Sequence, residues 1–340
     1  MNVLSLFDGI SCGQLALQRA GIKVDNYFAS EVDAKAIAVT QRHFPNTIQL
    51  GDVRNIKAKD LPKIDLVLAG SPCQGLSVCG KRLGFDDPRS ALFWEFVRIL
   101  DEVDPTYWLL ENVRMAKEDR DTINEALGVE GVKINSNLIS CQNRDRYYWF
   151  NIPYAGKPED KHIYVKDILE SDVEAKYWLT EDYLRSKNLE WLNTLREEVM
   201  QGLNQVTALC PNNAQAGRVY DFNGKSPALT ALGGGLGAKT GLYMCPKIIQ
   251  RTTRGPNNDK GIKEGYAGKL PYITTSNWEH NFYAALEYYG IRRFTPIEAE
   301  RAQTIPDNYT EGYTPPQRYK LVGNAWTVDV VAHLLKGINL

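Results

Sequence analysis

The sequence predicts an α/β fold with a mixed, mostly parallel sheet, together with a smaller loop-rich domain. Over the first 150 residues, short β-rich runs alternate with amphipathic stretches, which is typical of strands joined by helices in a parallel sheet. Ten of the chain's 27 glycines fall between residues 218 and 269, a density that disfavours long helices and favours loops. The 340 residues are enough for two domains.

Five short apolar runs in the first domain predict strands, at residues 2–6, 27–30, 48–50, 64–69 and 107–110. An amphipathic helix is expected over residues 13–20, after the first strand. A second helix is expected from Asp33 to about residue 43, because an Asp in the first turn and Pro45 just beyond the end are typical helix boundaries.

The tail regains helical character from Arg292. The run Thr295-Pro296-Ile297-Glu298 is typical of a helix start, with a capping side chain, a proline at the first helical position and an early acid. A last helix is expected over residues 326–336, where apolar side chains recur at helical spacing.

Polar residues follow four of the predicted strands. They are Glu31, Gly51-Asp52, Ser71-Pro72-Cys73-Gln74 and Glu111-Asn112. In an open α/β sheet, the carboxyl ends of the strands border the ligand crevice. We therefore expect these four clusters to converge on one site.

Composition excludes several classes of protein. With 43% hydrophobic and 24% charged residues, the chain is neither disordered nor fibrous. No apolar run reaches ~18 residues and no basic leader precedes the first apolar stretch, so we expect a cytosolic protein without a membrane segment. The six cysteines form no C-x-x-C pair or zinc-like spacing, which predicts reduced thiols and no metal site.

The net charge of −1 conceals a basic segment. Residues 218–269 carry nine Lys and Arg against three acids, a balance of 9 − 3 = +6, whereas residues 155–200 carry seven positive and eleven negative side chains, a balance of −4. Either a polyanionic partner or a solvated basic loop would account for the basic segment.

The loop from Phe7 to Gly13 joins the first strand to the first helix. Its two glycines allow a tight turn and a close approach of the backbone to a ligand at the helix N-terminus. Glu31, at the end of the second strand, lies where nucleotide-binding folds place an acid on ribose hydroxyls, and Asp52 is suited to an adenine amino group. Together, these strand ends predict an adenosine-containing cofactor.

Cys73 is the candidate nucleophile. It follows Ser71-Pro72 at a strand end, where proline fixes the turn and directs the thiol into the crevice. Glu111 ends the neighbouring strand and could stabilise charge on a substrate, and Arg144 and Arg146 would add fixed positive charge nearby.

The chain resembles the DNA (cytosine-5)-methyltransferase family of bacterial and phage type, because its motifs occur in the family's order. They are Phe7-Asp8-Gly9, Glu31, Asp52, Pro72-Cys73-Gln74, Glu111-Asn112-Val113, Gln142-x-Arg144-x-Arg146, residues 293–301 and Gly323-Asn324-Ala325. The resemblance implies a Rossmann-like, S-adenosylmethionine-dependent catalytic domain at residues 1–154 and 291–340. It implies a target-recognition domain at residues 155–290.

The resemblance also implies roles for individual residues. Catalysis would involve Cys73, Glu111, Arg144 and Arg146. Contacts with S-adenosyl-L-methionine would come from Phe7, Asp8, Gly9, Ile10, Ser11, Glu31, Val32, Asp52, Val53, Ser71, Pro72, Asn324, Ala325 and Trp326. DNA contacts would come from Gln74, Ser77, Lys81, Arg82, Arg89, Arg218, Lys239, Arg251 and Arg254, and Lys225, Lys260 and Lys263 are further candidates for phosphates.

The implied reaction methylates carbon 5 of cytosine in double-stranded DNA. Cys73 would attack carbon 6 of the ring, and Glu111 would stabilise the charge that appears at nitrogen 3 and the amino group. The target base must leave the helix to reach the pocket, and residues 74–89 form the loop expected to move, with glycine hinges.

Three positions depart from the family's pattern. Ser11 stands where a glycine is usual, Ser71 replaces a common proline, and Trp326 occupies the place of a smaller residue in many relatives. In the second domain, four aromatic residues are expected in the core rather than stacked on bases: Trp178, Trp191, Tyr220 and Trp278.

Three alternatives remain beside this interpretation. A methyltransferase acting on RNA would use the same pocket, although the long domain at 155–290 favours duplex DNA. A non-catalytic, methyltransferase-like DNA-binding protein would have no need of Cys73 beside Glu111. A nicotinamide-dependent oxidoreductase would not explain Pro72-Cys73-Gln74 or the basic segment. The methyl-transfer chemistry itself requires only a monomer.

Overall fold

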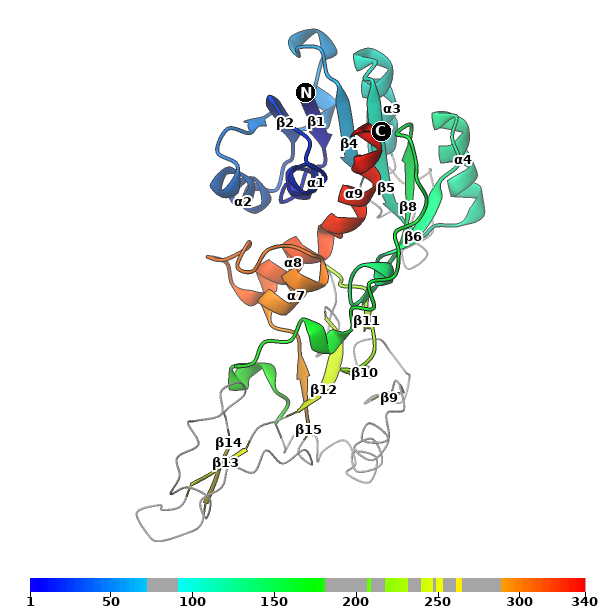
Figure 1. Cartoon of the computed structure of the whole chain (residues 1–340). Helices are drawn as coiled ribbons and strands as arrows, with labels where there is room; N and C mark the ends of the chain where they lie inside the picture. The colour runs from blue at the N-terminus through cyan, green and yellow to red at the C-terminus, as the bar shows by residue number, and fades with distance from the viewer. Residues whose placement is uncertain are drawn as a thin grey trace.

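A seven-stranded sheet forms the centre of the larger part of the molecule (Figure 1). The computed structural model describes residues 1–71, 91–180, 207–208, 218–231, 240–246, 249–252, 261–264 and 289–339. In spatial order the strands are β3 (Ile48–Gln49), β2 (Asn26–Ser30), β1 (Asn2–Leu6), β4 (Leu66–Gly70), β5 (Tyr107–Val113), β8 (Asp145–Phe150) and β6 (Val132–Asn135). The first five strands are parallel and β8 is antiparallel to both neighbours, which confirms the predicted mixed sheet.

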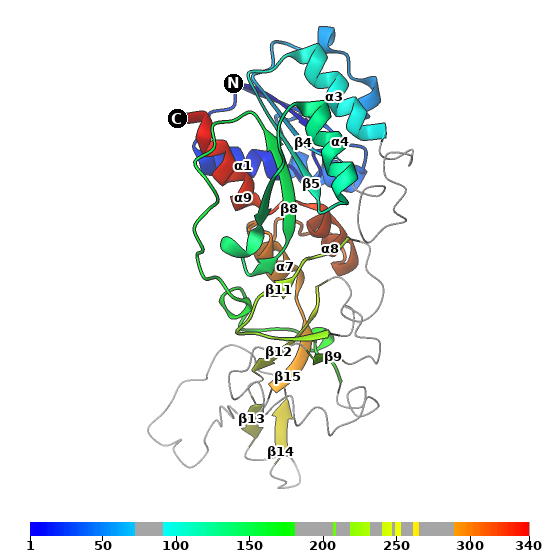
Figure 2. The same cartoon turned by 90° about the vertical axis from the view of Figure 1, so that its right-hand side faces the viewer.

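Helices cover both faces of this sheet (Figures 1 and 2). One face packs against α1 (Cys12–Ala20), α2 (Ala34–His43) and α9 (Val328–Leu335). The other face packs against α3 (Ala91–Val103) and α4 (Lys117–Leu127). The strands between these layers are buried on both sides, as in other doubly wound folds.

The two ends of the chain meet in this part of the molecule, where α1 lies beside α9 (Figure 2). Arg19 on α1 forms an ion pair with Asp329 on α9 at 2.6 Å and also donates to the carbonyl of Thr304. The C-terminal segment therefore completes the fold that the N-terminal 150 residues begin.

A second, smaller sheet lies at the other end of the molecule (Figure 1). Its strands, in spatial order, are β15 (Tyr289–Arg293), β12 (Leu242–Pro246), β10 (Arg218–Asp221) and β9 (Thr207–Ala208). Two further short pairs are β7 (Gln142–Asn143) with β11 (Ser226–Pro227), and β13 (Ile249–Thr252) with β14 (Gly261–Glu264). The pairing of β7 with β11 joins the glycine-rich region to the segment that directly precedes β8 of the large sheet.

A buried ion pair links the small sheet to the helix that follows it in the chain. Arg292 on β15 donates to both carboxylate oxygens of Glu298 on α7 (Pro296–Ala302), each at 2.6 Å. Thr295 and Glu298 also form a capping box with Pro296 in the first turn, which confirms the helix start predicted from these residues.

Several element boundaries differ from the predictions. The strand expected to end at residue 110 runs to Val113, because β8 offers partners to three more residues and pairs Glu111 with Tyr148. Glu111 and Asn112 thus lie within β5 rather than after it. The last helix begins at Val328 instead of residue 326, since Ala325 is extended and Thr327 is the N-cap. Asp33 is the N-cap of α2, where its side chain accepts from the N–H of Lys35.

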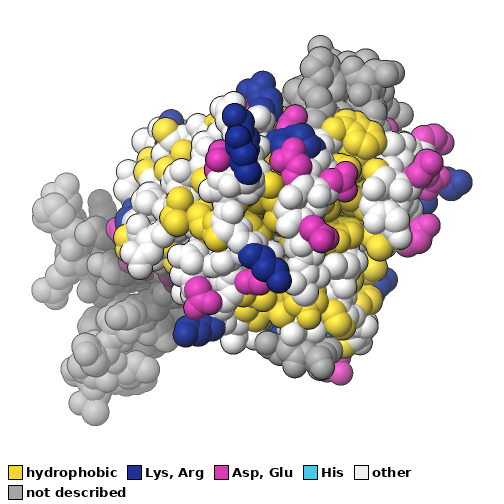
Figure 3. All heavy atoms as spheres, turned by 90° about the horizontal axis from the view of Figure 1, so that it is seen from above, with side chains coloured by type: hydrophobic (Ala, Val, Ile, Leu, Met, Phe, Trp, Pro, Cys, Tyr) yellow, Lys and Arg dark blue, Asp and Glu magenta, His cyan; other side chains and the backbone are white. Residues whose placement is uncertain are grey.

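The surface at the end opposite β13 and β14 carries charges of both signs. Figure 3 shows Lys and Arg side chains interspersed with Asp and Glu there, with apolar side chains between them.

No helix within the described ranges is long and apolar enough to cross a membrane. Trp178 and Tyr220 pack, partly buried, against the core as predicted. Trp191 and Trp278 lie outside the described residues.

Candidate active site

A cavity of about 660 Å³ opens at the carboxyl ends of β1, β2, β4 and β5. Residues from all four predicted strand-end clusters line it, so the expected convergence is confirmed for their described members. The predicted site residues in its wall are Phe7, Asp8, Gly9, Ile10, Glu31, Val32, Asp52, Val53, Ser71, Glu111, Arg144, Arg146, Asn324, Ala325 and Trp326.

The loop between β1 and α1 has an unusual backbone that shapes one wall of the cavity. Phe7, Gly9 and Ser11 all adopt left-handed conformations, with φ near +60°. Such a conformation costs a non-glycine residue about 1 kcal/mol or more. At Ser11 a hydrogen bond from the hydroxyl to Asp8 Oδ2 at 2.6 Å offsets part of that cost. A serine is therefore accommodated where the family usually has glycine.

Ser11 is predicted to contact the cofactor, and this stays a prediction. Its side chain is fully buried behind the loop, where it donates to Asp8 and accepts from Gln14. Cys12, the next residue, lines the cavity in its place.

Asp8 is held in the same loop by two hydroxyl groups. Ser11 Oγ donates to one carboxylate oxygen and Tyr27 Oη donates to the other at 2.8 Å. Burial is the main cause that raises the pKa of Asp8 to about 6, against an ordinary value of 3.8. The carboxyl group at this wall of the cavity therefore titrates just below neutral pH.

This shift predicts a pH-dependent stability. Because the folded-state pKa lies above the unfolded value, the contribution of Asp8 is fully present below pH 3.8 and is lost as the pH rises through about 6. The total change corresponds to up to about 3 kcal/mol. Asp8→Asn removes the titration. The free energy of unfolding of the variant minus that of wild type should therefore increase from pH 4 to 6.5, measured by urea denaturation.

Asp25→Asn is the control for this experiment. The N-terminal ammonium lowers the pKa of the exposed Asp25, so this variant's difference from wild type should stay constant between pH 5 and 7. A difference for Asp8→Asn that is equally flat would contradict the proposed titration.

Glu31 is fixed by three backbone N–H groups. Oε1 accepts from Val32 and Asp33, and Oε2 accepts from Gly9 at 2.8 Å. A carboxylate offers about four lone-pair positions, so one remains for a further donor from the cavity. A ribose hydroxyl is a donor of the required kind.

Asp52 remains ionised at neutral pH. Arg54 donates through both its backbone N–H and its guanidinium, and these interactions lower the pKa of Asp52 to about 2. An ionised carboxylate only accepts hydrogen bonds, which suits an exocyclic amino group. Arg54 also lines the cavity and was not identified from the sequence.

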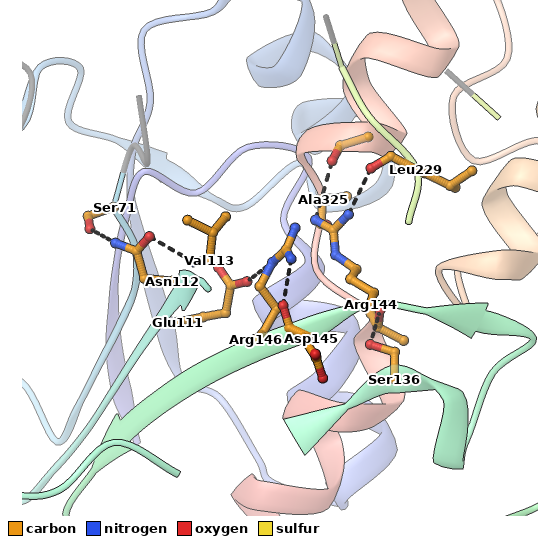
Figure 4. A network of polar contacts seen from close by, with 12 residues as sticks. Ser71, Glu111, Asn112, Val113, Ser136, Arg144, Asp145, Arg146, Leu229 and Ala325 are labelled. Atoms are coloured by element: carbon orange, nitrogen blue, oxygen red, sulfur yellow. Dashed lines mark hydrogen bonds and ion pairs between the residues drawn. The ribbon is translucent and has the colours of Figure 1, made fainter. Parts of the chain in front are cut away.

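Glu111 and Arg146 form an ion pair across β5 and β8 (Figure 4). Arg146 Nε lies 2.9 Å from Glu111 Oε1, and the two side chains are only 15% and 11% exposed. Their strands place them together because Val113, two residues after Glu111, pairs with Arg146 in the antiparallel ladder. The guanidinium thus orients a carboxylate in the cavity wall.

Asn112, beside Glu111, links β5 to the end of β4. Its Nδ2 donates to the hydroxyl of Ser71 at 2.9 Å, and its Oδ1 accepts from the N–H of Val113 (Figure 4). Ser71 is the last described residue before Pro72-Cys73. Ser71 therefore supplies a buried hydrogen bond immediately before Pro72-Cys73 in the chain.

Arg144 lies at the cavity, as predicted, and its catalytic role stays a prediction. Its side chain borders the cavity, but its guanidinium donates to the carbonyls of Leu229, Gly323 and Ala325 (Figure 4). Arg144 is only 4% exposed, and a buried guanidinium needs such acceptors to offset its lost hydration. Arg146, rather than Arg144, contacts Glu111.

Trp326 is accommodated by a glycine that the sequence did not single out. A Cβ at Gly70 would lie 2.7 Å from Trp326 Nε1, too close for any side chain. The pair explains how this chain carries a tryptophan where many relatives have a smaller residue. The signal was present in the sequence as a glycine at the end of the predicted strand before Ser71.

The described thiols are poor candidates for a nucleophile. Cys12, Cys141 and Cys245 are all buried, and burial raises the pKa of each to about 12. These three cysteines are therefore protonated at neutral pH. No group of three or more potential metal-ligating side chains occurs in the part of the chain that the structure describes.

The remaining predicted residues fall into three groups. Outside the described residues lie Pro72, Cys73, Gln74, Ser77, Lys81, Arg82, Arg89, Lys239, Arg254 and Lys260. Arg218 begins β10, and the backbones of Arg251 and Lys263 lie in β13 and β14. Lys225 is a correction: its ammonium donates to the carbonyls of Asn137, Ser140 and Ile163, so it is not presented to a phosphate.

The fold and the cavity define a class of enzyme. A doubly wound sheet with a glycine-containing loop and two acids at its carboxyl edge is the Rossmann-like arrangement for an adenosine cofactor, here S-adenosylmethionine. The chain belongs to the family of C-5 cytosine-specific DNA methylases, whose model matches residues 1–339. It is thus an S-adenosylmethionine-dependent methyltransferase that acts on carbon 5 of cytosine in DNA, as the resemblance implied.

Individual relatives agree with this assignment. The chain is 28% identical to the orphan methyltransferase M.SPRI of Bacillus phage SPR, over 99% of this chain and 97% of that protein. It is 31% identical to the orphan methyltransferase M.Rho11sI of Bacillus phage rho11s, over 85% of this chain and 70% of that protein.

Solved structures show the same fold. The Dnmt2 methyltransferase of S. pombe superposes with a TM-score of 0.61 at 19% identity, over 98% of this chain and 97% of that one. A putative DNA modification methyltransferase encoded within an E. coli prophage superposes with a TM-score of 0.62 at 20% identity, over 100% of this chain and 98% of that one.

Proposed function

We propose that the enzyme methylates a cytosine flipped out of double-stranded DNA, with Cys73 as the nucleophile and Glu111 as the group that activates the ring. The observation that carries this proposal is the Glu111–Arg146 ion pair, which lies in the same cavity wall as Glu31 and Asp52. One cavity therefore brings a ring-binding carboxylate next to residues suited to adenosine.

The position of Ser71 supports Cys73 as the nucleophile. Ser71 lines the cavity, and a residue two positions further along any chain is within about 7 Å. Of the six cysteines, the three described ones are protonated, which leaves Cys73, Cys79 and Cys210. Among these, Cys73 alone immediately follows the cavity wall in sequence.

The proposed reaction balances as an addition followed by an elimination. The Cys73 thiolate forms a bond to carbon 6 of cytosine, and the ring electrons move to carbon 5. Glu111, held by Arg146, stabilises the charge that develops at nitrogen 3 and the amino group. Carbon 5 would then take the methyl group that the bound cofactor supplies, and the carbon–sulfur bond that breaks would leave S-adenosylhomocysteine. Loss of its proton to a base expels Cys73 and restores the ring.

The cavity fits the adenosine part of the cofactor. When bound, S-adenosylmethionine supplies an electrophilic methyl group. Glu31 would hold the ribose through its free lone pair, and Asp52 would accept from the adenine amino group. Val32, which is 71% exposed at the cavity, would cover the apolar face of the adenine.

Asp52→Asn is expected to weaken cofactor binding without slowing chemistry. The amide can turn its NH₂ group toward the adenine, and the hydrogen bond is then lost. This loss should raise the Kd of S-adenosylhomocysteine by about 5–30-fold. The value of kcat at saturating S-adenosylmethionine should stay within about threefold. Calorimetric titration and steady-state kinetics measure the two effects separately.

Asp33→Asn is the matched control, because Asp33 also lines the cavity but binds Lys320 and caps α2. Its Kd should stay within about threefold of the wild-type value. Equal affinities for wild type and Asp52→Asn would exclude Asp52 as the adenine contact.

Residues 155–290 are proposed to form the target-recognition domain, with residues 1–154 and 291–340 as the catalytic domain. The strands β9, β10 and β12 of the small sheet provide its framework, and β15 crosses the boundary between the two domains. The basic segment would contact phosphates through residues such as Arg218, Lys239, Arg251 and Arg254. The loop at residues 74–89 would contribute Gln74, Ser77, Lys81, Arg82 and Arg89 from the catalytic side.

We further propose that the enzyme works as a monomer, without a metal ion, in the cytoplasm of a bacterial cell or of a phage-infected host. The addition–elimination chemistry requires only one active site and no metal.

Transfer of a labelled methyl group tests the substrate. Mixed-sequence duplex DNA and an RNA transcript of the same sequence are incubated with S-adenosylmethionine labelled in its methyl group, then digested to nucleosides. The proposal predicts label in 5-methyldeoxycytidine from the duplex. Label confined to the RNA would support the RNA alternative, and binding of the duplex and of S-adenosylhomocysteine without transfer would support the non-catalytic one.

A further inference from the structure

The backbone of Leu229 is held at both its N–H and its carbonyl by residues that precede β8. Gln142 Oε1 accepts from its N–H at 2.9 Å. Arg144 donates to its carbonyl at 3.0 Å (Figure 4). Leu229 is 3% exposed and lies just after β11, in the region proposed for target recognition. Two side chains on one short segment thus fix the backbone of one residue in that region.

The same two side chains also reach the wall of the cavity. The second terminal nitrogen of Arg144 donates to the carbonyls of Gly323 at 3.3 Å and Ala325 at 3.1 Å. Gln142 Nε2 donates to Gln303 Oε1, and Gln303 Nε2 donates in turn to the carbonyl of Ala325 at 3.0 Å. Two hydrogen-bonded routes therefore run from Leu229 to Ala325.

A direct backbone contact reinforces this connection. A Cβ at Gly323 would lie 2.6 Å from the nitrogen of Ala231 and 2.6 Å from the carbonyl carbon of Thr230. The end of α8 (Pro315–Asn324) therefore touches the chain just after Leu229 with no side chain between them. Gly323 and Ala325 line the cavity, whereas residues 229–231 do not.

We propose that Arg144 is a positioning residue that couples DNA binding by the target-recognition region to cofactor binding in the cavity, by tying the carbonyl of Leu229 to those of Gly323 and Ala325. The inference rests on the proposed function, because it takes residues 155–290 as the region that binds DNA. In this role Arg144 acts through the backbone carbonyls to which its guanidinium donates.

The physical basis is the cost of separating these groups. A displacement of Leu229 when DNA binds must either break a buried, charge-assisted hydrogen bond or move Ala325 with it, and the first course leaves a buried group unpaired. Moving Ala325 shifts the wall that carries Trp326. Coupling of this kind is reciprocal, so the cofactor should raise the affinity for DNA by the same factor.

Arg144→Lys tests the proposal, because lysine keeps the charge but its ammonium cannot span the three carbonyls as a guanidinium does. The Kd of S-adenosylhomocysteine is measured by calorimetry with and without excess mixed-sequence duplex DNA. We expect the duplex to lower this Kd by about tenfold or more in the wild type and by less than about twofold in Arg144→Lys.

Arg318→Lys is the matched control. Arg318 is also a largely buried arginine and lies on α8 itself, but it binds Glu300 and Thr310 instead of Leu229. In Arg318→Lys, the ratio of the Kd of S-adenosylhomocysteine without duplex DNA to the Kd with it should match the wild-type ratio. A wild-type ratio in Arg144→Lys, or a ratio of one in a wild-type protein that binds the duplex, would overturn the proposal.

Hydrogen exchange of the wild-type protein provides a test that needs no variant. S-adenosylhomocysteine alone should slow amide exchange in residues 226–231 by about fivefold or more, although these residues do not line the cavity. Protection confined to the cavity residues would contradict the coupling. If the wild type neither binds nor methylates the duplex, the proposed function fails first; if it does both and the ratios are unchanged, only this inference fails.

Discussion

Glu111→Gln is expected to lower kcat by about 10²–10⁴-fold while leaving the Kd of S-adenosylhomocysteine within about threefold. The carboxylate faces a cavity, is only 11% exposed and is oriented by Arg146 at 2.9 Å. An amide cannot supply the charge and the proton exchange that nitrogen 3 requires during attack at carbon 6. Single-turnover methyl transfer to duplex DNA isolates this chemical step from product release.

Glu95→Gln is the matched control, since Glu95 is an acid of the same cavity wall that pairs with Arg98 instead. Its kcat should stay within about threefold of wild type. A Glu111→Gln enzyme with unchanged kcat would remove Glu111 from the mechanism, whatever its effect on stability.

Cys73→Ala is expected to abolish methyl transfer and to leave cofactor affinity within a few-fold. Without the thiolate there is no addition to carbon 6, and carbon 5 of cytosine is too weak a nucleophile to take the methyl group directly. The comparison is made with filter-bound methyl transfer at high enzyme concentration and with calorimetric binding of S-adenosylhomocysteine.

Cys79→Ala is its control, because Cys79 is a second thiol only six residues further along the chain. This variant should retain activity within about threefold. Methyl transfer that survives in Cys73→Ala and is lost in Cys79→Ala would reassign the nucleophile.

The arrangement of the site could be predicted from the sequence because strand ends in a parallel sheet share one edge. Glu31, Asp52, Ser71 and Glu111 follow or end successive apolar runs, and the structure places all four around one cavity. This inference needed only the order of the strands and not their side-chain contacts. The capping box of Thr295 and Glu298 was predictable for a similar reason, since it depends on four consecutive residues.

Long-range contacts could not be predicted in this way. Arg144 and Arg146 are two residues apart and equally basic, yet one binds three carbonyls from distant segments and the other binds Glu111. Lys225 belongs to a basic segment, but three carbonyls hold its ammonium. Local charge does not reveal which acceptors a distant part of the chain will offer.

Two further features depended on steric fit. The room for Trp326 comes from the missing side chain of Gly70, which lies far away in the sequence. The left-handed backbone of Ser11 is stabilised by the hydrogen bond from its hydroxyl to Asp8. Patterns of single residue types carry no information about such compensating pairs.

The central claim is that Cys73 forms a covalent bond with carbon 6 of the target cytosine. Mixed-sequence duplex DNA containing 5-fluorocytosine is incubated with the enzyme and S-adenosylmethionine, then separated on a denaturing gel. Fluorine cannot leave carbon 5 as a proton does, so elimination stops and a denaturation-resistant complex should accumulate, dependent on both the cofactor and Cys73. An enzyme that methylates ordinary duplex DNA but releases the fluorinated duplex freely would contradict the mechanism.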